Sequence, residues 1–196
     1  MKTLLVYALN PEAGLIKDRF SKLDIKLSQP GMELLEADGK YDLLRTGIGL
    51  ERTRAVTRSL PDPRNYEQVI HFGVSGSLSD ELPVRTLIKG RCFMAKGEDP
   101  IEIESPLFSN VSSITFYSSQ EVVSDEGSRE EASSSGAKAV DMESYAIAEF
   151  CRDHDLPLLS LRIISDRAGA STPDEFRKNF KSASRELQKH IINYLF

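Results

Sequence analysis

The chain has 196 residues, of which 40% are hydrophobic, enough for a substantial core in one domain of ordinary size. Its 25 Lys and Arg against 30 Asp and Glu give a net charge of -5, which argues against a protein that coats nucleic acid or binds an anionic membrane. No apolar run approaches the roughly 20 residues of a membrane span, and two cysteines with three scattered histidines exclude a disulfide scaffold and a Cys/His zinc cluster, so we expect a cytoplasmic protein without a metal or organic cofactor.

The first segment of the chain predicts a buried strand followed by a helix. Thr3 to Ala8 is apolar without alternation, the pattern of a strand buried on both faces. Asn10-Pro11-Glu12 then supplies an N-cap, a proline for the first helical position and an acid for the first turn. Apolar residues three and four apart extend this predicted helix to Leu23. Three short strands separated by turn residues follow, over Ile25 to Leu27, Met32 to Glu36 and Tyr41 to Arg45.

Glycine-rich segments mark the middle of the chain. Gly47-Ile48-Gly49 leads into a helix predicted over Glu51 to Leu60, which prolines terminate. Gln68 to Phe72 is an apolar strand that runs into Gly73-Val74-Ser75-Gly76-Ser77, which we expect to be a loop. Two further strands and one polar segment, expected to be a mobile part of the surface, come next: Thr86 to Ala95, Ser113 to Ser118 and Glu126 to Ser135.

The last third has the clearest pattern. A helix is predicted from about Met142 to His154, followed by an apolar strand over Pro157 to Ile164 that ends at Ser165-Asp166. Thr172-Pro173-Asp174-Glu175 has the form of a capping box. It opens a final helix with a core-facing stripe of Phe176, Phe180, Ala183, Leu187 and Ile191.

Strands that alternate with helices predict an α/β fold, a single three-layer α/β/α domain over residues 1–196. Ligands of open α/β sheets bind outside the carboxyl ends of the strands. Such ends carry Glu12, Gly47 to Gly49, Gly73 to Ser77 and Ser165-Asp166. Neither G-x-G-x-x-G nor G-x-x-x-x-G-K-[ST] occurs, so the glycines are not those of a dinucleotide-binding or P-loop protein.

The acidic residues at these positions also have structural interpretations. Glu12 and Glu143 lie in first helical turns, where the helix dipole favours a carboxylate, and Ser165-Asp166 fits a turn. Glu143 leads an apolar stripe of Ile147 and Phe150, so we expect it to point inward. The spacing alone leaves both interpretations open.

Five segments carry a resemblance to a known family: Ala8–Glu12, Thr46–Gly49, Phe72–Leu78, Val140–Ala148 and Leu161–Asp166. Together they resemble the purine nucleoside phosphorylase and nucleosidase superfamily, especially its methylthioadenosine/S-adenosylhomocysteine nucleosidase branch. The last two segments are specific motifs, whereas the glycine turns alone are weak ones. The resemblance implies a central mixed, twisted and partly barrel-like sheet, and a homodimer.

The resemblance also implies a role for each acid. Asp166 stands where the family keeps the general acid that protonates N7 of the leaving purine, and Ser165 would orient it. Glu12 would be the base that polarises the attacking water. Glu143 would accept hydrogen bonds from the ribose hydroxyls, with Met142 packed against the sugar. These roles imply an N-ribosyl hydrolase that releases the free base from methylthioadenosine, S-adenosylhomocysteine or a related adenine nucleoside.

The remaining predicted site residues lie in two short segments. Backbone N–H groups of Gly73, Val74, Ser75 and Gly76 would help to hold water, phosphate or ribose. Val74 stands where the nucleosidases usually carry a serine, and Asp141 stands where they carry a glutamate; we expect Asp141 to pair with Arg162. The aromatic residue that stacks on the base is missing near Gln120 to Val123, so Val123 is the apolar candidate there, together with Val122.

Two other functions fit the same motifs. A phosphorylase, including the hopanoid-associated type, would use inorganic phosphate as the nucleophile and would need cationic donors, for which Arg52 and Arg54 are the nearby candidates. A nucleoside-binding protein without turnover would have no need for all three acids. Hydrolysis ranks first because Glu12 would repel a bound phosphate.

Overall fold

The computed structural model describes all 196 residues, and its backbone alternates strands with helices. The strands are β1 Lys2–Tyr7, β2 Leu23–Gln29, β3 Met32–Ala37, β4 Tyr41–Arg45, β5 Tyr66–Ser77, β6 Leu87–Ala95, β7 Ile101–Glu102, β8 Ser112–Ser118, β9 Ala139–Asp141 and β10 Leu158–Asp166. The helices are α1 Gly14–Lys17, α2 Leu50–Arg58, α3 Glu126–Ser134, α4 Ser144–Asp153 and α5 Thr172–Leu195, with 3-10 turns at Asn10–Glu12 and Pro63–Asn65. None of these helices has the length and apolar character needed to cross a membrane.

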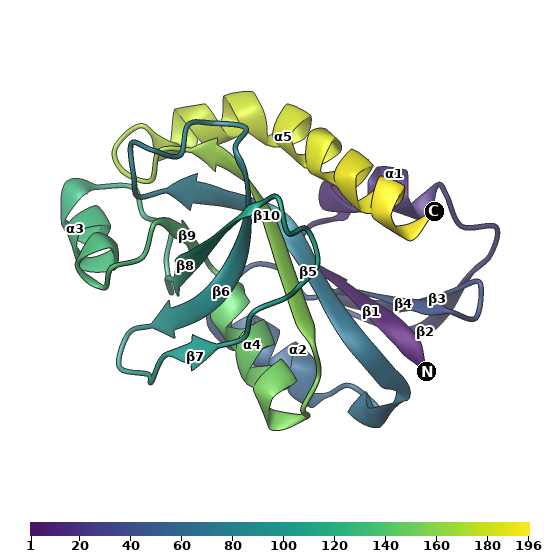
Figure 1. Ribbon diagram of the computed structural model, residues 1–196. Coiled ribbons are helices and arrows are strands. Elements are labelled where there is room, and N and C mark those ends of the chain that lie inside the picture. The colour runs from purple at the N-terminus through teal and green to yellow at the C-terminus, as the bar shows by residue number, and fades with distance from the viewer.

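All ten strands belong to one mixed sheet, and part of it closes into a barrel. Strand β5 pairs with β10, which pairs with β6, and β8 and β9 complete the ring back to β5. The N-terminal half of β5 also pairs with β1. Beyond β1, the strands β4, β3 and β2 continue the sheet as an open part that does not close on itself. The long β5 therefore joins the closed and open parts at the centre of the molecule (Figure 1). The predicted mixed, partly barrel-like sheet is confirmed.

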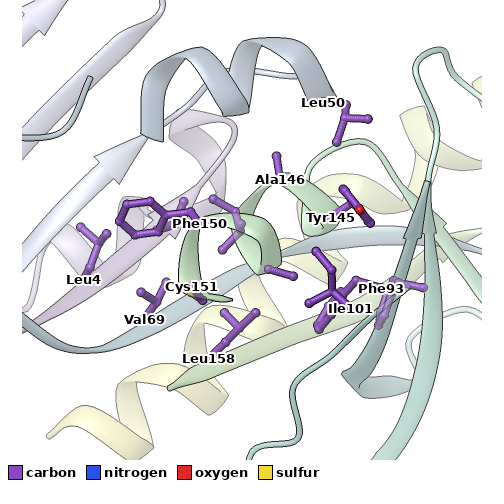
Figure 2. Close-up of a cluster of buried hydrophobic side chains, with 14 of the residues drawn as sticks. Leu4, Leu50, Val69, Phe93, Ile101, Tyr145, Ala146, Phe150, Cys151 and Leu158 are labelled. Carbon is purple, nitrogen blue, oxygen red and sulfur yellow. The ribbon is translucent and has the colours of Figure 1, made fainter. Parts of the chain in front are cut away.

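Helices cover both faces of this sheet, as the predicted three layers require. On one face, α2 and α4 pack on a cluster of buried side chains that includes Leu50, Phe150 and Leu158 (Figure 2). On the other face, α1 and the long α5 cover a second cluster, which contains Ile16 and Leu187 (Figure 1). Fully burying one such side chain contributes about 1.5–3 kcal/mol, so the two clusters hold the helices firmly against the sheet.

Three predicted boundaries are wrong. The first α-helix ends at Lys17, and Leu23 already belongs to β2. The polar segment Glu126 to Ser135, for which no regular element was predicted, contains the helix α3, which Asp125 caps by accepting a hydrogen bond from Ser128 N–H at 2.9 Å. The capping box at Thr172 is also wrong, because Thr172 is the first residue of α5 and Ser171 is the N-cap.

Candidate active site

A cavity of about 480 Å³ opens at the carboxyl ends of β1, β5 and β10. Its volume is in the range that holds a small ligand. Of the residues predicted from sequence, the following line it: Glu12, Val74, Ser75, Gly76, Val123, Met142, Glu143, Ser165 and Asp166. The exception is Gly73, which lies directly behind Glu12. The fold therefore brings the three acids, remote in the chain, to one cavity.

Glu12 is held by backbone donors from two segments. Its Oε2 accepts hydrogen bonds from Ala8 N–H at 3.2 Å and Leu9 N–H at 2.8 Å, and its Oε1 accepts one from Val74 N–H at 3.2 Å. The side chain is 5% exposed. Burial raises the pKa of Glu12, and the N–H groups and the charge of Arg162 partly oppose that rise. The result is a carboxyl group fixed in position that ionises above its ordinary range.

The position of Glu12 explains why the predicted glycine loop is a strand. A Cβ atom at Gly73 would lie 2.8 Å from Glu12 Oε1, and one at Gly76 would lie 2.9 Å from Asp166 Oδ1. Residues 73–77 continue β5, and two positions lack side chains because carboxyl oxygens occupy that space. Here the glycines leave space for two carboxyl groups, and they do not form a turn.

Glu143 lies where β9 passes into α4, at the N-cap of that helix. Its Oε1 accepts a hydrogen bond from Gly49 N–H at 2.9 Å, so it is tied to the glycine turn before α2. Gly49 has a φ of 113°, a conformation that side-chain-bearing residues rarely adopt. Burial, and then the charge of Asp141, raise the pKa of Glu143.

A buried ion pair lies beneath these acids. Arg162 Nη2 is 2.9 Å from Asp141 Oδ2, and the two side chains are 1% and 2% exposed. The predicted pairing of Asp141 with Arg162 is therefore confirmed. Asp141 also accepts hydrogen bonds from the hydroxyls of Ser118, at 2.7 Å, and Ser144. Arg162 Nη2 contacts the ring of His71, whose pKa is held well below its ordinary value by burial and by Arg162, which keeps this histidine neutral.

Asp166 ends β10 on the other side of the cavity. Ser165 Oγ donates a hydrogen bond to Asp166 Oδ2 at 2.7 Å and also contacts Ser75 O at 3.3 Å. The Asp166 side chain is buried, and this burial raises its pKa, while Ser165 and Thr172 act in the opposite direction. A carboxyl group with a raised pKa holds its proton to higher pH, which suits a proton donor.

The aromatic surface of the cavity comes from α5. Phe176 and Phe180, one helical turn apart, stack with ring centroids 4.8 Å apart and both line the cavity. We expected both rings to face the core because they continue the apolar stripe of α5. The stripe is real, but its first two members extend past the buried core to the cavity, and Ala183, Leu187 and Ile191 alone are buried. Spacing gave no signal that separates the two environments.

No lysine or arginine side chain lines the cavity. Arg54 is paired with three carboxylates, those of Glu51, Glu98 and Glu149, at 2.8 to 2.9 Å. Arg52 donates to Pro30 O at 3.3 Å. Neither Arg52 nor Arg54, which the sequence suggested as phosphate ligands, is therefore directed at the acids that line the cavity. No cluster of His, Cys, Asp and Glu side chains has an arrangement that could hold a metal ion.

Known proteins resemble this chain in sequence and in fold. A family model described as the phosphorylase superfamily matches residues 95–195. A 5′-methylthioadenosine/S-adenosylhomocysteine nucleosidase of Thermotoga maritima is 26% identical over 150 residues, 68% of this chain and 69% of that protein. A futalosine hydrolase of Streptomyces coelicolor is 24% identical over 200 residues, 86% of this chain and 85% of that protein. The crystal structure of a 5′-methylthioadenosine/S-adenosylhomocysteine nucleosidase of Helicobacter pylori superposes with a TM-score of 0.87 at 20% identity, covering 100% of this chain and 99% of that one.

Proposed function

The chain belongs to the phosphorylase superfamily, and from this premise we propose that it is a nucleosidase that hydrolyses the N-glycosidic bond of a purine nucleoside and releases the free base. The proposed substrate is 5′-methylthioadenosine, S-adenosylhomocysteine or a related adenine nucleoside. The observation that carries the proposal is the meeting of Glu12, Glu143 and Asp166 around one cavity that has no cationic side chain.

Asp166 is the proposed general acid. Breaking the bond between sugar and purine leaves negative charge on the base, and protonation at N7 neutralises it as the bond lengthens. The raised pKa of Asp166 supports this role, because the carboxyl group keeps its proton closer to neutral pH. The hydrogen bond from Ser165 to Oδ2 leaves Oδ1 as the oxygen available to the base.

Glu12 is the proposed base that polarises the attacking water. An acid on one side of the scissile bond and a base on the other is the arrangement of inverting glycosidases. Both Glu12 oxygens accept backbone hydrogen bonds, so the carboxylate approaches water from a fixed direction. A water bound there would face the anomeric carbon opposite the leaving base.

Glu143 and the apolar lining are the proposed substrate-binding groups. Glu143 would accept hydrogen bonds from the ribose hydroxyls, and Met142 would pack against the sugar. The backbone of Val74, Ser75 and Gly76 forms the cavity wall between Glu12 and Asp166. Val123 and the two phenylalanines of α5 would cover the apolar parts of the nucleoside, including the surface that the missing aromatic residue near Val123 would otherwise supply.

The absence of a cationic side chain from the cavity wall favours water over phosphate as the nucleophile. Phosphate is an anion at neutral pH and would lie next to Glu12. A protein that only binds nucleosides would have no use for an acid and a base on opposite sides of the sugar. Hydrolysis is the reaction that employs all three carboxyl groups.

The proposal is tested by incubating the protein with methylthioadenosine, S-adenosylhomocysteine, adenosine and inosine, each with and without phosphate, and measuring free base by chromatography. We expect release of adenine without phosphate. Release that depends strictly on phosphate would make the protein a phosphorylase. No release from any nucleoside, with thermal stabilisation by one of them, would make it a binding protein.

We also propose that the protein is a homodimer. Ile48 and Val122 line the cavity, yet they are 49% and 56% exposed, so apolar surface is left open at the cavity mouth. A second copy over this mouth would bury both side chains. Sedimentation equilibrium should give twice the mass of the chain, and Ile48→Asp should shift the protein toward the monomer.

A further inference from the structure

Helix α3 is docked on the end of the cavity that carries Asp166, with little apolar surface to hold it there. Ala132 is its one buried residue, in a small cluster with Val123 and Ala168, which both line the cavity. A helix with so few apolar contacts would detach readily without polar contacts to its support. In Figure 1 it lies at the margin of the molecule, beside β8 and β9.

Arg129 of α3 supplies polar contacts to two strand ends beside the cavity. Its Nη1 donates to Ser77 O at 3.0 Å and also to Ala168 O. Ser77 directly follows Gly76 at the end of β5, and Ala168 comes two residues after Asp166 at the end of β10. One guanidinium therefore joins the end of β5 to the segment that directly follows Asp166. Arg129 forms no ion pair, whereas the half-buried Arg54 and Lys17 both pair with acids.

The segment that Arg129 grips is itself tied to the cavity wall. Gly169 N–H donates to Val123 O at 3.2 Å and to Thr172 Oγ1 at 2.8 Å. Gly169 has a φ of 150°, and a Cβ atom there would lie 3.7 Å from Arg129 Cδ. Across the same gap, a Cβ atom at Gly76 would be 2.9 Å from Asp166 Oδ1 and 3.1 Å from Ala168 Cβ. Ala168 and the Asp166 carboxyl group therefore lie beside the same point of β5, and both are carried by the segment that Arg129 holds.

We propose that Arg129 is a positioning residue, which fixes the direction of the Asp166 carboxyl group by clamping the ends of β5 and β10 to α3. This proposal rests on the proposed function, because it concerns the proton transfer to the leaving base. Arg129 touches neither the cavity nor Asp166, and it acts through the carbonyl groups of Ser77 and Ala168. Misplacing a catalytic group by about 1 Å can lower a rate by about 100-fold.

The test is a double-mutant cycle with Arg129→Gln, Asp166→Asn and the double variant, measured as base release from the substrate that the wild-type protein cleaves best. We expect Arg129→Gln to lower kcat by about 10- to 100-fold, and Arg129→Lys, which keeps the charge, to recover most of it. In the Asp166→Asn background, Arg129→Gln should have no further effect. Glu131→Ala is the matched control, because it removes the contacts of α3 with Tyr117 and Lys96 and leaves the strand ends alone; it should stay near wild type.

Each other result overturns the positioning role. If the two substitutions multiply in the double variant, or if Glu131→Ala loses as much activity as Arg129→Gln, Arg129 only supports the fold. An unchanged kcat in Arg129→Gln excludes any role. The measurement on the wild-type protein distinguishes failure of the positioning role from failure of the proposed function. If the proposed function is wrong, the wild-type protein itself releases no base.

Discussion

The two ends of the cavity hold their acids in different ways. Glu12 is fixed by three backbone N–H groups, and Glu143 by one, above the buried pair of Arg162 and Asp141. Asp166 is fixed by one hydroxyl group, from Ser165, and by the segment that follows it, which α3 clamps from outside. The acids at the sugar end of the proposed site are thus held by backbone groups, whose positions the fold determines. The acid at the base end is held by side chains, and substituting these should cost less stability.

Glu12→Gln should show the largest combined effect. Backbone N–H groups donate to both carboxyl oxygens of Glu12, so the amide NH₂ of a glutamine must face at least one of these donors. A buried donor left without an acceptor lowers the free energy of unfolding by about 1–3 kcal/mol. Base release should fall by at least ~100-fold as the base is lost. Chemical denaturation and the base-release assay check the two parts, with the exposed Glu67→Gln as control. Wild-type stability in Glu12→Gln would contradict the holding of Glu12 by the backbone.

Asp166→Asn should lose activity without losing stability. The hydroxyl of Ser165 can still donate to the amide oxygen, so the hydrogen bonding is largely kept. We expect base release to fall by at least ~100-fold, the scale of losing a general acid. The thermal midpoint should stay near that of wild type and of Asp174→Asn, an exposed change on α5. Near-normal turnover would show that another group protonates the base.

Charge on the substrate should sharpen the contrast between the two ends. Carboxyl groups line the cavity at both ends, and no cation does. A 5′-phosphate would lie in this field, and like-charge contacts cost several kcal/mol. The value of kcat/KM for a nucleoside 5′-monophosphate should therefore be at least ~10-fold below that for the parent nucleoside. Equal values would mean that the 5′ side of the substrate lies outside the acidic field.

The smallest effect should be that of Glu143→Gln on the pH dependence of the free energy of unfolding. The pKa of Glu143 is raised by burial and by Asp141, so the folded state binds its proton more tightly than the unfolded state does. The stability from this group is fully present below the ordinary value of 4.5 and is lost as pH rises through the raised pKa. Glu143→Gln should therefore flatten the fall in unfolding free energy between about pH 5 and pH 8. The exposed Glu130→Gln should leave the slope unchanged, and an unchanged slope in Glu143→Gln would contradict the assignment.

The sequence was informative about the acids because strand ends and helix starts are local signals. Glu12 and Asp166 come at or soon after the ends of predicted strands, and the parallel strands β1, β5 and β10 bring such residues to one edge. Glu143 was predicted at the start of a helix, where its position ahead of an apolar stripe indicated that it points inward. The pairing of Asp141 with Arg162 followed from charge. The barrel closure did not follow from any local pattern, since β10 and β6 pair antiparallel although they lie far apart in the chain, as Leu161 and Lys89 do. It was expected from the family resemblance.

Other features depend on packing that local patterns do not record. Gly73 and Gly76 predicted a loop, yet they continue a strand because the carboxyl groups of Glu12 and Asp166 fill the space of their side chains. The helix α3 was missed because its polar composition hides its one buried alanine; the N-cap at Asp125 was the available signal. Arg129 is likewise invisible from sequence, because its partners are carbonyl oxygens that every residue carries.

In the proposed function, three acids around one cavity direct water, without phosphate, to the sugar carbon of a purine nucleoside. The most direct measurement incubates the wild-type protein with methylthioadenosine in phosphate-free buffer made with water labelled with heavy oxygen, and follows base and sugar by mass spectrometry. We expect equal amounts of adenine and free sugar, with the label on the sugar carbon and no change when phosphate is added. A sugar 1-phosphate formed only in the presence of phosphate, or no cleavage of this or any other purine nucleoside, would contradict it.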